Sequence, residues 1–191
     1  MADAPITVIF ADISGSTMLC AVRGDETAYK LVSTCLTILE TEVRRFGGRV
    51  IKRVGDAILA VFDAAEPAVH AAQSMQIALE APGSEVHAEG VRVRVGIATG
   101  TAVLDAGDIY GDVVNVAARL TSLAGADEVF MAGETFEALP VPMRDPVRVI
   151  DQLALRVPEV HEREPLHDRF AAKQHQRYRM RAAVGRSRPE R

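Results

Sequence analysis

The sequence predicts an α+β fold, a ferredoxin-like split βαβ sheet with helices packed on one face. Short β-branched runs alternate with longer stretches whose apolar residues recur at helical spacing, in the order strand, helix, strand, strand, helix, strand. The 191 residues are 48% hydrophobic and 25% charged, which is the composition of a folded globular protein. Because folds of this class host many chemistries, function has to be argued from individual residues.

The chain opens with a strand and a long helix. Residues 6–11 (ITVIFA) are β-branched and aromatic, which predicts a buried strand that delivers Asp12 to its end. Residues 26–46 carry an apolar stripe at helical spacing and are followed by Gly47 and Gly48, so we expect a helix that stops there.

A hairpin follows the helix. Residues 49–54 and 57–62 are apolar-rich runs separated only by Gly55 and Asp56. This spacing predicts two antiparallel strands joined by a two-residue turn. The turn presents Asp56, so a second carboxylate is expected at a strand end.

The alternation continues to residue 132. Pro67 opens a helix, and the stretch from Gly83 to Gly90 is expected to be a loop. The expected elements are helices at 67–81 and 113–123 and strands at 91–98, 101–104 and 129–132.

The pattern weakens beyond residue 140 and predicts three parts: a domain of residues 1–140, a loop-rich edge of it at 141–168, and a basic tail at 169–191. We expect the tail to be partly helical or disordered. It holds eight Lys or Arg residues and one Glu, a charge of +7, so residues 1–168 carry −11 to give the total of −4. An acidic domain is a poor polyanion binder, which makes a nucleic-acid partner unexpected.

Other classes of protein are disfavoured by what the sequence lacks. It has no run of 18 apolar residues and no basic start before an apolar stretch, so we expect a cytoplasmic protein without a membrane span or signal peptide. The two cysteines and five histidines show no zinc-ligand spacing, so neither a zinc nor a haem site is expected.

Asp12 and Asp56 are the first candidates for chemistry, since each is expected at a turn beside a strand end. Carboxylate oxygens bind hard divalent cations, and substrate phosphates and water can fill the remaining positions. Such a pair could serve two-metal phosphoryl chemistry. Aspartates at strand ends are also ordinary turn formers, so the pair alone leaves both interpretations open.

Four separated segments resemble the class III nucleotidyl cyclases, in particular adenylate cyclase catalytic domains of bacterial type. The segments are 10–17 (FADISGST), 52–56 (KRVGD), 94–100 (RVGIATG) and 108–119 (DIYGDVVNVAAR). Each is weak alone, but all four occur in order at spacings consistent with one sheet. The resemblance implies the cyclase catalytic fold.

The resemblance implies that Asp12 and Asp56 hold two divalent cations, Mg²⁺ or Mn²⁺, with the backbone carbonyl of Ile13 as a further ligand. One ion would lower the pKa of the ribose 3′-hydroxyl for attack on the α-phosphate, and the other would hold the β- and γ-phosphates. The next segment contains Gly15, Ser16 and Thr17 and leads towards a helix, so its backbone N–H groups could face phosphate oxygens. Its alternative role is a simple Ser/Thr cap.

Lys52 and Asp108 match the family's adenine-selecting pair. A Lys donor and a carboxylate acceptor suit N1 and the exocyclic amine of adenine, whereas guanine presents the opposite pattern. A guanylate cyclase of the family would carry Glu in place of Lys52 and a small residue or Cys in place of Asp108. The resemblance therefore implies ATP as substrate, with cyclic AMP and pyrophosphate as products.

Asn115 and Arg119 match the family's transition-state residues, and Arg94 matches a contact to the β- and γ-phosphates. Asn115 and Arg119 are four residues apart on the predicted helix, so they share one face. The resemblance implies that Asn115 orients the ribose. Arg119 would neutralise charge at the α-phosphate, a task suited to a guanidinium that keeps its proton. Without the resemblance they would be a solvated helix face and an edge-strand arginine.

The family assembles its site across a dimer, with the metal aspartates from one protomer and the base-selecting and transition-state residues from the other. Because this chain carries both sets, the resemblance implies a homodimer with two equivalent sites. One family feature is missing: a Lys in a Leu-Lys-Gly-like segment that touches the substrate phosphates. Arg144, Arg148 or Arg156 could substitute for it.

Two alternatives stay open. The first is a cyclase with another product, cyclic GMP or a cyclic pyrimidine nucleotide, because base choice depends on only two side chains. The second is a catalytically silent module that binds nucleotide or dimerises, which the presence of Asp12, Asp56, Asn115 and Arg119 makes the weaker hypothesis.

Overall fold

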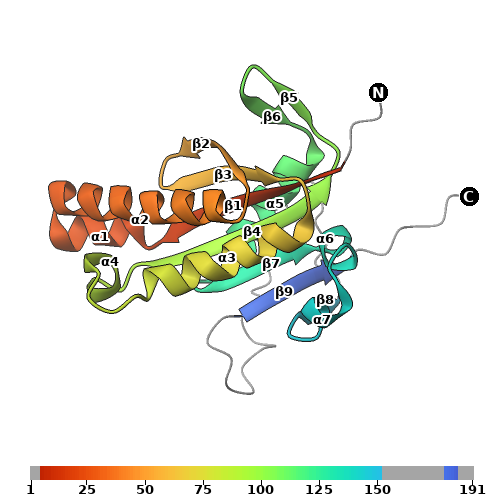
Figure 1. The fold of residues 1–191 in the computed structure, drawn as a ribbon. Helices are drawn as coiled ribbons and strands as arrows, with labels where there is room; N and C mark the ends of the chain where they lie inside the picture. The colour runs from red at the N-terminus through yellow and green to blue at the C-terminus, as the bar shows by residue number, and fades with distance from the viewer. Residues whose placement is uncertain (1–4, 152–178, 185–191) are drawn as a thin grey trace, which may run out of the picture.

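The structure is a computed structural model that describes residues 5–151 and 179–184. Its strands form one large sheet and one small ribbon. The sheet contains β1 (Ile6–Ser14), β2 (Arg49–Val54), β3 (Ala57–Phe62), β4 (Arg92–Gly100), β7 (Glu128–Ala132), β8 (Arg148–Asp151) and β9 (Arg179–Val184). Their order across the sheet is β2-β3-β1-β4-β7-β9-β8. The ribbon, β5 (Val103–Asp105) and β6 (Asp108–Tyr110), projects from the sheet (Figure 1).

Four helices of eight residues or more accompany these strands in the described ranges. They are α1 (Ser16–Arg23), α2 (Asp25–Arg45), α3 (Ala65–Leu79) and α5 (Asp112–Leu123). Shorter helices are α4 (Glu85–Ala88), α6 (Gly133–Glu137) and α7 (Val141–Arg144). Of the helices described, none has both the length and the apolar character needed to cross a membrane. The predicted α+β class is confirmed.

The central strand β1 is hydrogen-bonded on both sides, antiparallel to β3 and to β4. Its side chains alternate between two cores. Ile9, Ala11 and Ile13 belong to the larger core, and Val8 belongs to the smaller one on the other side. The sheet is therefore buried on both faces at its centre.

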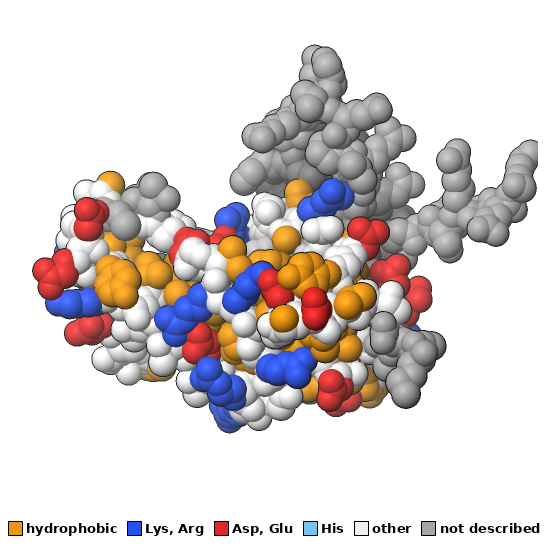
Figure 2. Space-filling model, turned by 90° about the horizontal axis from the view of Figure 1, so that it is seen from above, with side chains coloured by type: hydrophobic (Ala, Val, Ile, Leu, Met, Phe, Trp, Pro, Cys, Tyr) orange, Lys and Arg blue, Asp and Glu red, His pale blue; other side chains and the backbone are white. Residues whose placement is uncertain are grey.

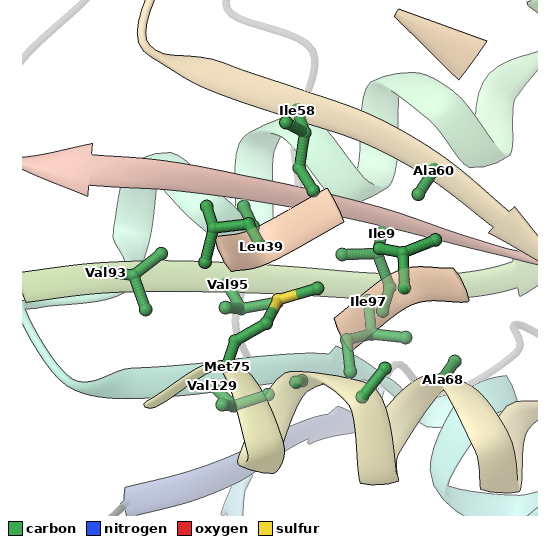
Figure 3. Packing of buried hydrophobic residues seen from close by; sticks show 14 of the residues in the cluster. Ile9, Leu39, Ile58, Ala60, Ala68, Met75, Val93, Val95, Ile97 and Val129 are labelled. Atoms are coloured by element: carbon green, nitrogen blue, oxygen red, sulfur yellow. The ribbon is translucent and has the colours of Figure 1, made fainter. Parts of the chain in front are cut away.

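The helices α2 and α3 cover one face of the sheet (Figure 1). The apolar stripe of α2 delivers Leu39, and α3 delivers Met75, onto Ile9, Ile58 and Ile97 of three neighbouring strands (Figure 3). Each of these side chains is fully buried, and burial of one such side chain stabilises a fold by about 1.5–3 kcal/mol. This layer anchors the strands that carry the candidate site.

The opposite face is covered by α5, so the expectation that helices pack on one face only is corrected in this respect. Val113, Ala117 and Leu120 of α5 are buried in the smaller core. The physical reason lies in the strands: all six residues of β3 are buried, so the sheet presents apolar side chains on both sides and needs cover on both.

The C-terminal edge of the sheet is parallel. β7 pairs with β4, and β9 lies between β7 and β8 and pairs with both. Arg179–Val184 therefore form a strand where the sequence predicts a partly helical or disordered tail, because partners on both sides supply the backbone hydrogen bonds. Residues 169–178 and 185–191 lie outside the described residues, and the three-part division of the chain stays a prediction.

Candidate active site

Asp12 and Asp56 are neighbours at one end of the strands, with Asp12 on the central strand β1. Asp12 is near the end of β1, opposite Ala57, and Asp56 occupies the turn between β2 and β3. The backbone N–H of Ile13 donates to the carbonyl of Asp56 at 3.3 Å. Gly55 has φ +62°, which a two-residue hairpin turn requires, so the predicted turn and its carboxylate are confirmed.

The surroundings of the Asp12 carboxylate shift its pKa. Burial raises the pKa of Asp12 above its ordinary value of 3.8, and Arg94 opposes this by hydrogen bonding and by charge. The Asp56 carboxylate raises the pKa of Asp12 further, again by charge and by hydrogen bonding. Two acidic groups whose charges act on each other at a half-buried position suit a bound cation.

The oxygen atoms at this site would suit a hard divalent ion that takes some of its ligands from the substrate. Carboxylate and carbonyl oxygens from Asp12, Asp56 and Ile13 suit Mg²⁺ or Mn²⁺, which are commonly held by one or two carboxylates together with phosphates and water. Within the described ranges, no cluster of three or more His, Cys, Asp or Glu side chains offers a complete protein cage. The oxygen donors of Asp12, Asp56 and Ile13 would leave coordination positions for phosphate and water.

The Ser16 hydroxyl donates a hydrogen bond to Asp56 Oδ2. Ser16 is the first residue of α1, and Gly15 before it has φ +84°, which turns the chain from β1 into the helix. Thr17 follows in the first turn of α1. The hydroxyl contact was missed by sequence reasoning, because Ser16 and Asp56 are 40 residues apart and no local pattern links them.

Arg94 contacts the other carboxylate. Its Nε donates to Asp12 Oδ2 at 2.6 Å, and its Nη2 is 2.5 Å from the same oxygen. Arg94 and Asp12 are cross-strand partners on β4 and β1, so their side chains leave the same face of the sheet. The structure thus joins a predicted phosphate contact to a predicted metal ligand.

Lys52 and Asp108 form a second pair. Lys52 on the edge strand β2 donates from Nζ to Asp108 Oδ2 at 2.5 Å, although 56 residues separate them. Lys52 lowers the pKa of Asp108, and so does the backbone N–H of Ile109, which donates to Asp108 Oδ1 at 2.8 Å. The pair ties the β5–β6 ribbon to the main sheet.

Asn115 and Arg119 lie on α5 away from its buried side. Asn115 is exposed and Arg119 is half-buried, so α5 has a polar side as well as a buried one. Within residues 5–151 and 179–184, neither side chain forms a hydrogen bond or ion pair. A second contact that sequence reasoning missed is that of Thr121, whose Oγ1 donates to the carbonyl of Phe10 at 3.2 Å and so fastens α5 to β1.

The candidate residues share one side of the sheet. Asp12 and Arg94 are cross-strand partners on the α5 side, and Lys52 is opposite Leu59, which belongs to the smaller core on that side. Two contact groups result, one built around Asp12 and Asp56 and one formed by Lys52 and Asp108. No hydrogen bond or ion pair among the described residues connects either group to α5's candidate residues.

The candidates to replace the missing phosphate-binding Lys are engaged or outside the described ranges. Arg144 donates to the carbonyls of Leu139 at 2.9 Å and Glu137 at 2.6 Å, so its guanidinium is used at the end of α6. Arg148 is in β8 and also has a partner. Arg156 lies outside the described residues. None of the three is supported as a phosphate ligand.

Comparison with known proteins gives a family for this site. Residues 2–158 match the family described as the adenylate and guanylate cyclase catalytic domain. An adenylate cyclase of Streptomyces coelicolor is 37% identical over 132 residues, which are 69% of this chain and 33% of that protein. An adenylate cyclase of Streptomyces griseus is 34% identical over 133 residues, which are 70% of this chain and 32% of that protein.

A solved structure also resembles this chain in fold. An adenylate cyclase of Trypanosoma brucei, solved in its monomeric state, superposes with a TM-score of 0.64 at 26% identity and covers 74% of this chain and 79% of that one. The chain spans about a third of the length of the two Streptomyces relatives. With the family match extending over most of its length, the chain belongs to the family of adenylate and guanylate cyclase catalytic domains.

Proposed function

We propose that this chain is an adenylate cyclase that converts ATP to 3′,5′-cyclic AMP and pyrophosphate, with two Mg²⁺ or Mn²⁺ ions, at a homodimer interface. Family membership gives the reaction class, and both Streptomyces relatives are adenylate cyclases. The observation that carries the choice of base is the contact between Lys52 Nζ and Asp108 Oδ2.

Adenine fits the Lys52–Asp108 pair through two hydrogen bonds of opposite direction. Lys52 would donate to N1 of the base, and Asp108 would accept from the exocyclic amine. Guanine would set its N1–H donor against Lys52 and its carbonyl oxygen against Asp108. Neither group would then find a hydrogen-bonding partner on the base, which is the kind of mismatch that gives strong discrimination.

The metal ions would be held by Asp12, Asp56 and the carbonyl of Ile13. When bound, they supply activation of the 3′-hydroxyl and neutralisation of the phosphates. Ser16 would keep the Asp56 carboxylate in place through its hydroxyl, since it already donates to Oδ2. The N-terminus of α1, at Ser16 and Thr17, would add backbone N–H groups for a phosphate.

The transition state would be stabilised from α5. Arg119 is half-buried and its guanidinium makes no ion pair within the described ranges, so it can approach the α-phosphate without breaking one there. Asn115, one turn earlier on the same face, would hold the ribose through its amide.

A second copy of the chain would complete each site. Apolar side chains are exposed at the last residue of β2 and on the ribbon; they are Val54 (45%), Val103 (57%), Leu104 (48%) and Tyr110 (56%). In the view from above Figure 1, apolar side chains lie among basic and acidic ones (Figure 2). A mixed surface of this kind next to Lys52 and Asp108 supports a dimer interface that brings the two halves of the site together.

The test is product identification. The purified protein is incubated separately with ATP, GTP, CTP and UTP, with Mg²⁺ or Mn²⁺, and products are identified by mass. We expect cyclic AMP from ATP and none from Asp56→Ala. If another cyclic nucleotide forms instead, the protein is a cyclase for that nucleotide and the proposed choice of ATP is wrong. If a folded dimer forms no product, a silent nucleotide-binding module is favoured.

A further inference from the structure

Arg94 and Asp12 form a charged contact in which two of the three guanidinium nitrogens converge on a single carboxylate oxygen. Nε is 2.6 Å and Nη2 is 2.5 Å from Asp12 Oδ2. The Asp12 side chain is only 16% exposed and that of Arg94 is 36% exposed, so solvent screens this contact less than a surface ion pair. The positively charged Arg94 guanidinium therefore already contacts the carboxylate that is expected to bind a cation.

The two carboxylates of the site are partnered differently. Asp56 Oδ2 accepts from the neutral hydroxyl of Ser16, which adds no net charge. Asp12 Oδ2 accepts from a positively charged guanidinium, which does add charge. A divalent cation bound through Asp12 would stand a few ångströms from that guanidinium, where like charges repel strongly at reduced dielectric.

We propose that Arg94 competes with the divalent cation for Asp12 and thereby couples cation binding to binding of the triphosphate. The coupling rests on the proposed function and on the contact to the β- and γ-phosphates that the family resemblance implies for Arg94. A bound triphosphate gives the guanidinium another anionic partner and releases Asp12 Oδ2 to the cation. Because such coupling is reciprocal, the cation also strengthens nucleotide binding.

Arg92 provides a matched control. It lies on β4 two residues before Arg94, so both side chains leave the same face of the strand. Its Nε is 3.0 Å from Asp127 Oδ2, and its cross-strand partner on β1 is Ser14 rather than Asp12. Arg92→Gln therefore removes the same charge from the same strand without freeing Asp12.

The experiment measures Mn²⁺ binding without nucleotide, by electron paramagnetic resonance of the free ion, for the wild type, Arg94→Gln and Arg92→Gln. Competition predicts that Arg94→Gln binds Mn²⁺ about fivefold or more tightly than the wild type, while Arg92→Gln changes affinity less than about twofold. Arg94→Lys keeps a charge and should stay closer to the wild type. Thermal unfolding of each variant confirms that it is folded.

Arg94→Gln affinity equal to or weaker than that of the wild type would overturn the competition, because Arg94 would then merely orient Asp12. Absence of measurable Mn²⁺ binding in both proteins would overturn it as well. The coupling is tested by repeating the titration with a non-hydrolysable ATP analogue. The analogue should tighten Mn²⁺ binding more in the wild type than in Arg94→Gln, and an equal gain in both would overturn the coupling.

These readouts are independent of turnover. If the wild type forms no cyclic nucleotide but Arg94→Gln still tightens Mn²⁺ binding, the competition at Asp12 holds and the proposed catalytic function fails. If the wild type is an active cyclase and Arg94→Gln does not tighten Mn²⁺ binding, the catalytic function holds and the competition fails.

Discussion

Gly96 of β4 lies against the backbone of α5, and a Cβ atom at this position would be 2.2 Å from the carbonyl oxygen of Ala117. The same Cβ would be 2.5 Å from Thr121 Oγ1, the atom that donates to the carbonyl of Phe10. Phe10 precedes Asp12 by two residues on β1. Because Gly96 has no side chain, α5 can pack close to β1, the strand that carries Asp12. This packing sets how far the proposed transition-state residues of α5 are from that carboxylate.

Replacement of Gly96 by Ala should destabilise the protein by about 1–3 kcal/mol, because α5 has to move away from the sheet. Denaturant unfolding gives the change in free energy, and cyclase activity should fall with it. Gly125→Ala is the matched control: its Cβ would meet nothing closer than 3.4 Å, so a change within about 0.5 kcal/mol is expected. A Gly96→Ala protein as stable as the Gly125→Ala protein would contradict this account.

The turn of the β5–β6 ribbon should be stabilised by Ala106→Asn. Ala106 has φ +47° and Gly107 has φ +86°, and two positive φ values in succession favour Asn-Gly over Ala-Gly. The expected gain is about 0.5–1 kcal/mol, read from hydrogen exchange of the ribbon amides. Asp105→Asn, one residue earlier and outside the turn, should give no such gain. Equal protection in both variants would argue against strain at residue 106.

The acid response of the Lys52–Asp108 contact follows from the lowered pKa of Asp108. Its folded pKa lies below the ordinary value of 3.8, so the contact contributes fully above that value and is lost as pH falls through the folded pKa. In Lys52→Gln the pKa of Asp108 should rise towards 3.8, as followed by the NMR shift of its carboxyl carbon. Lys30→Gln, which breaks an exposed contact with Glu26 on α2, should leave it unchanged. Identical Asp108 titrations in both variants would count against the contact.

Elements with strong local signals could be predicted from the sequence. The β-branched run that forms β1, the helical stripe of α2 and the Gly55-Asp56 turn are each decided by residues close together in the chain. The position of Asp12 beside Asp56 followed from those elements, because β1 and the hairpin meet in one sheet.

Features that depend on distant partners could not be predicted. β9 exists because β7 and β8 flank it, and α5 takes the second face because β3 is apolar on both sides. The contacts of Arg94 with Asp12 and of Ser16 with Asp56 join residues 82 and 40 positions apart. No local periodicity encodes such pairs, so the electrostatics of the site emerge only from the folded chain.

The composite homodimeric site is tested most directly by mixing two inactive variants, Asp56→Ala and Arg119→Ala, which remove opposite halves of the proposed site. If each site takes one half from each protomer, an equal mixture regains one intact site in every mixed dimer, about a quarter of the wild-type rate. Cyclic AMP formation by the mixture, absent from either variant alone, is the result we predict. A mixture that forms mixed dimers but remains inactive would contradict the account.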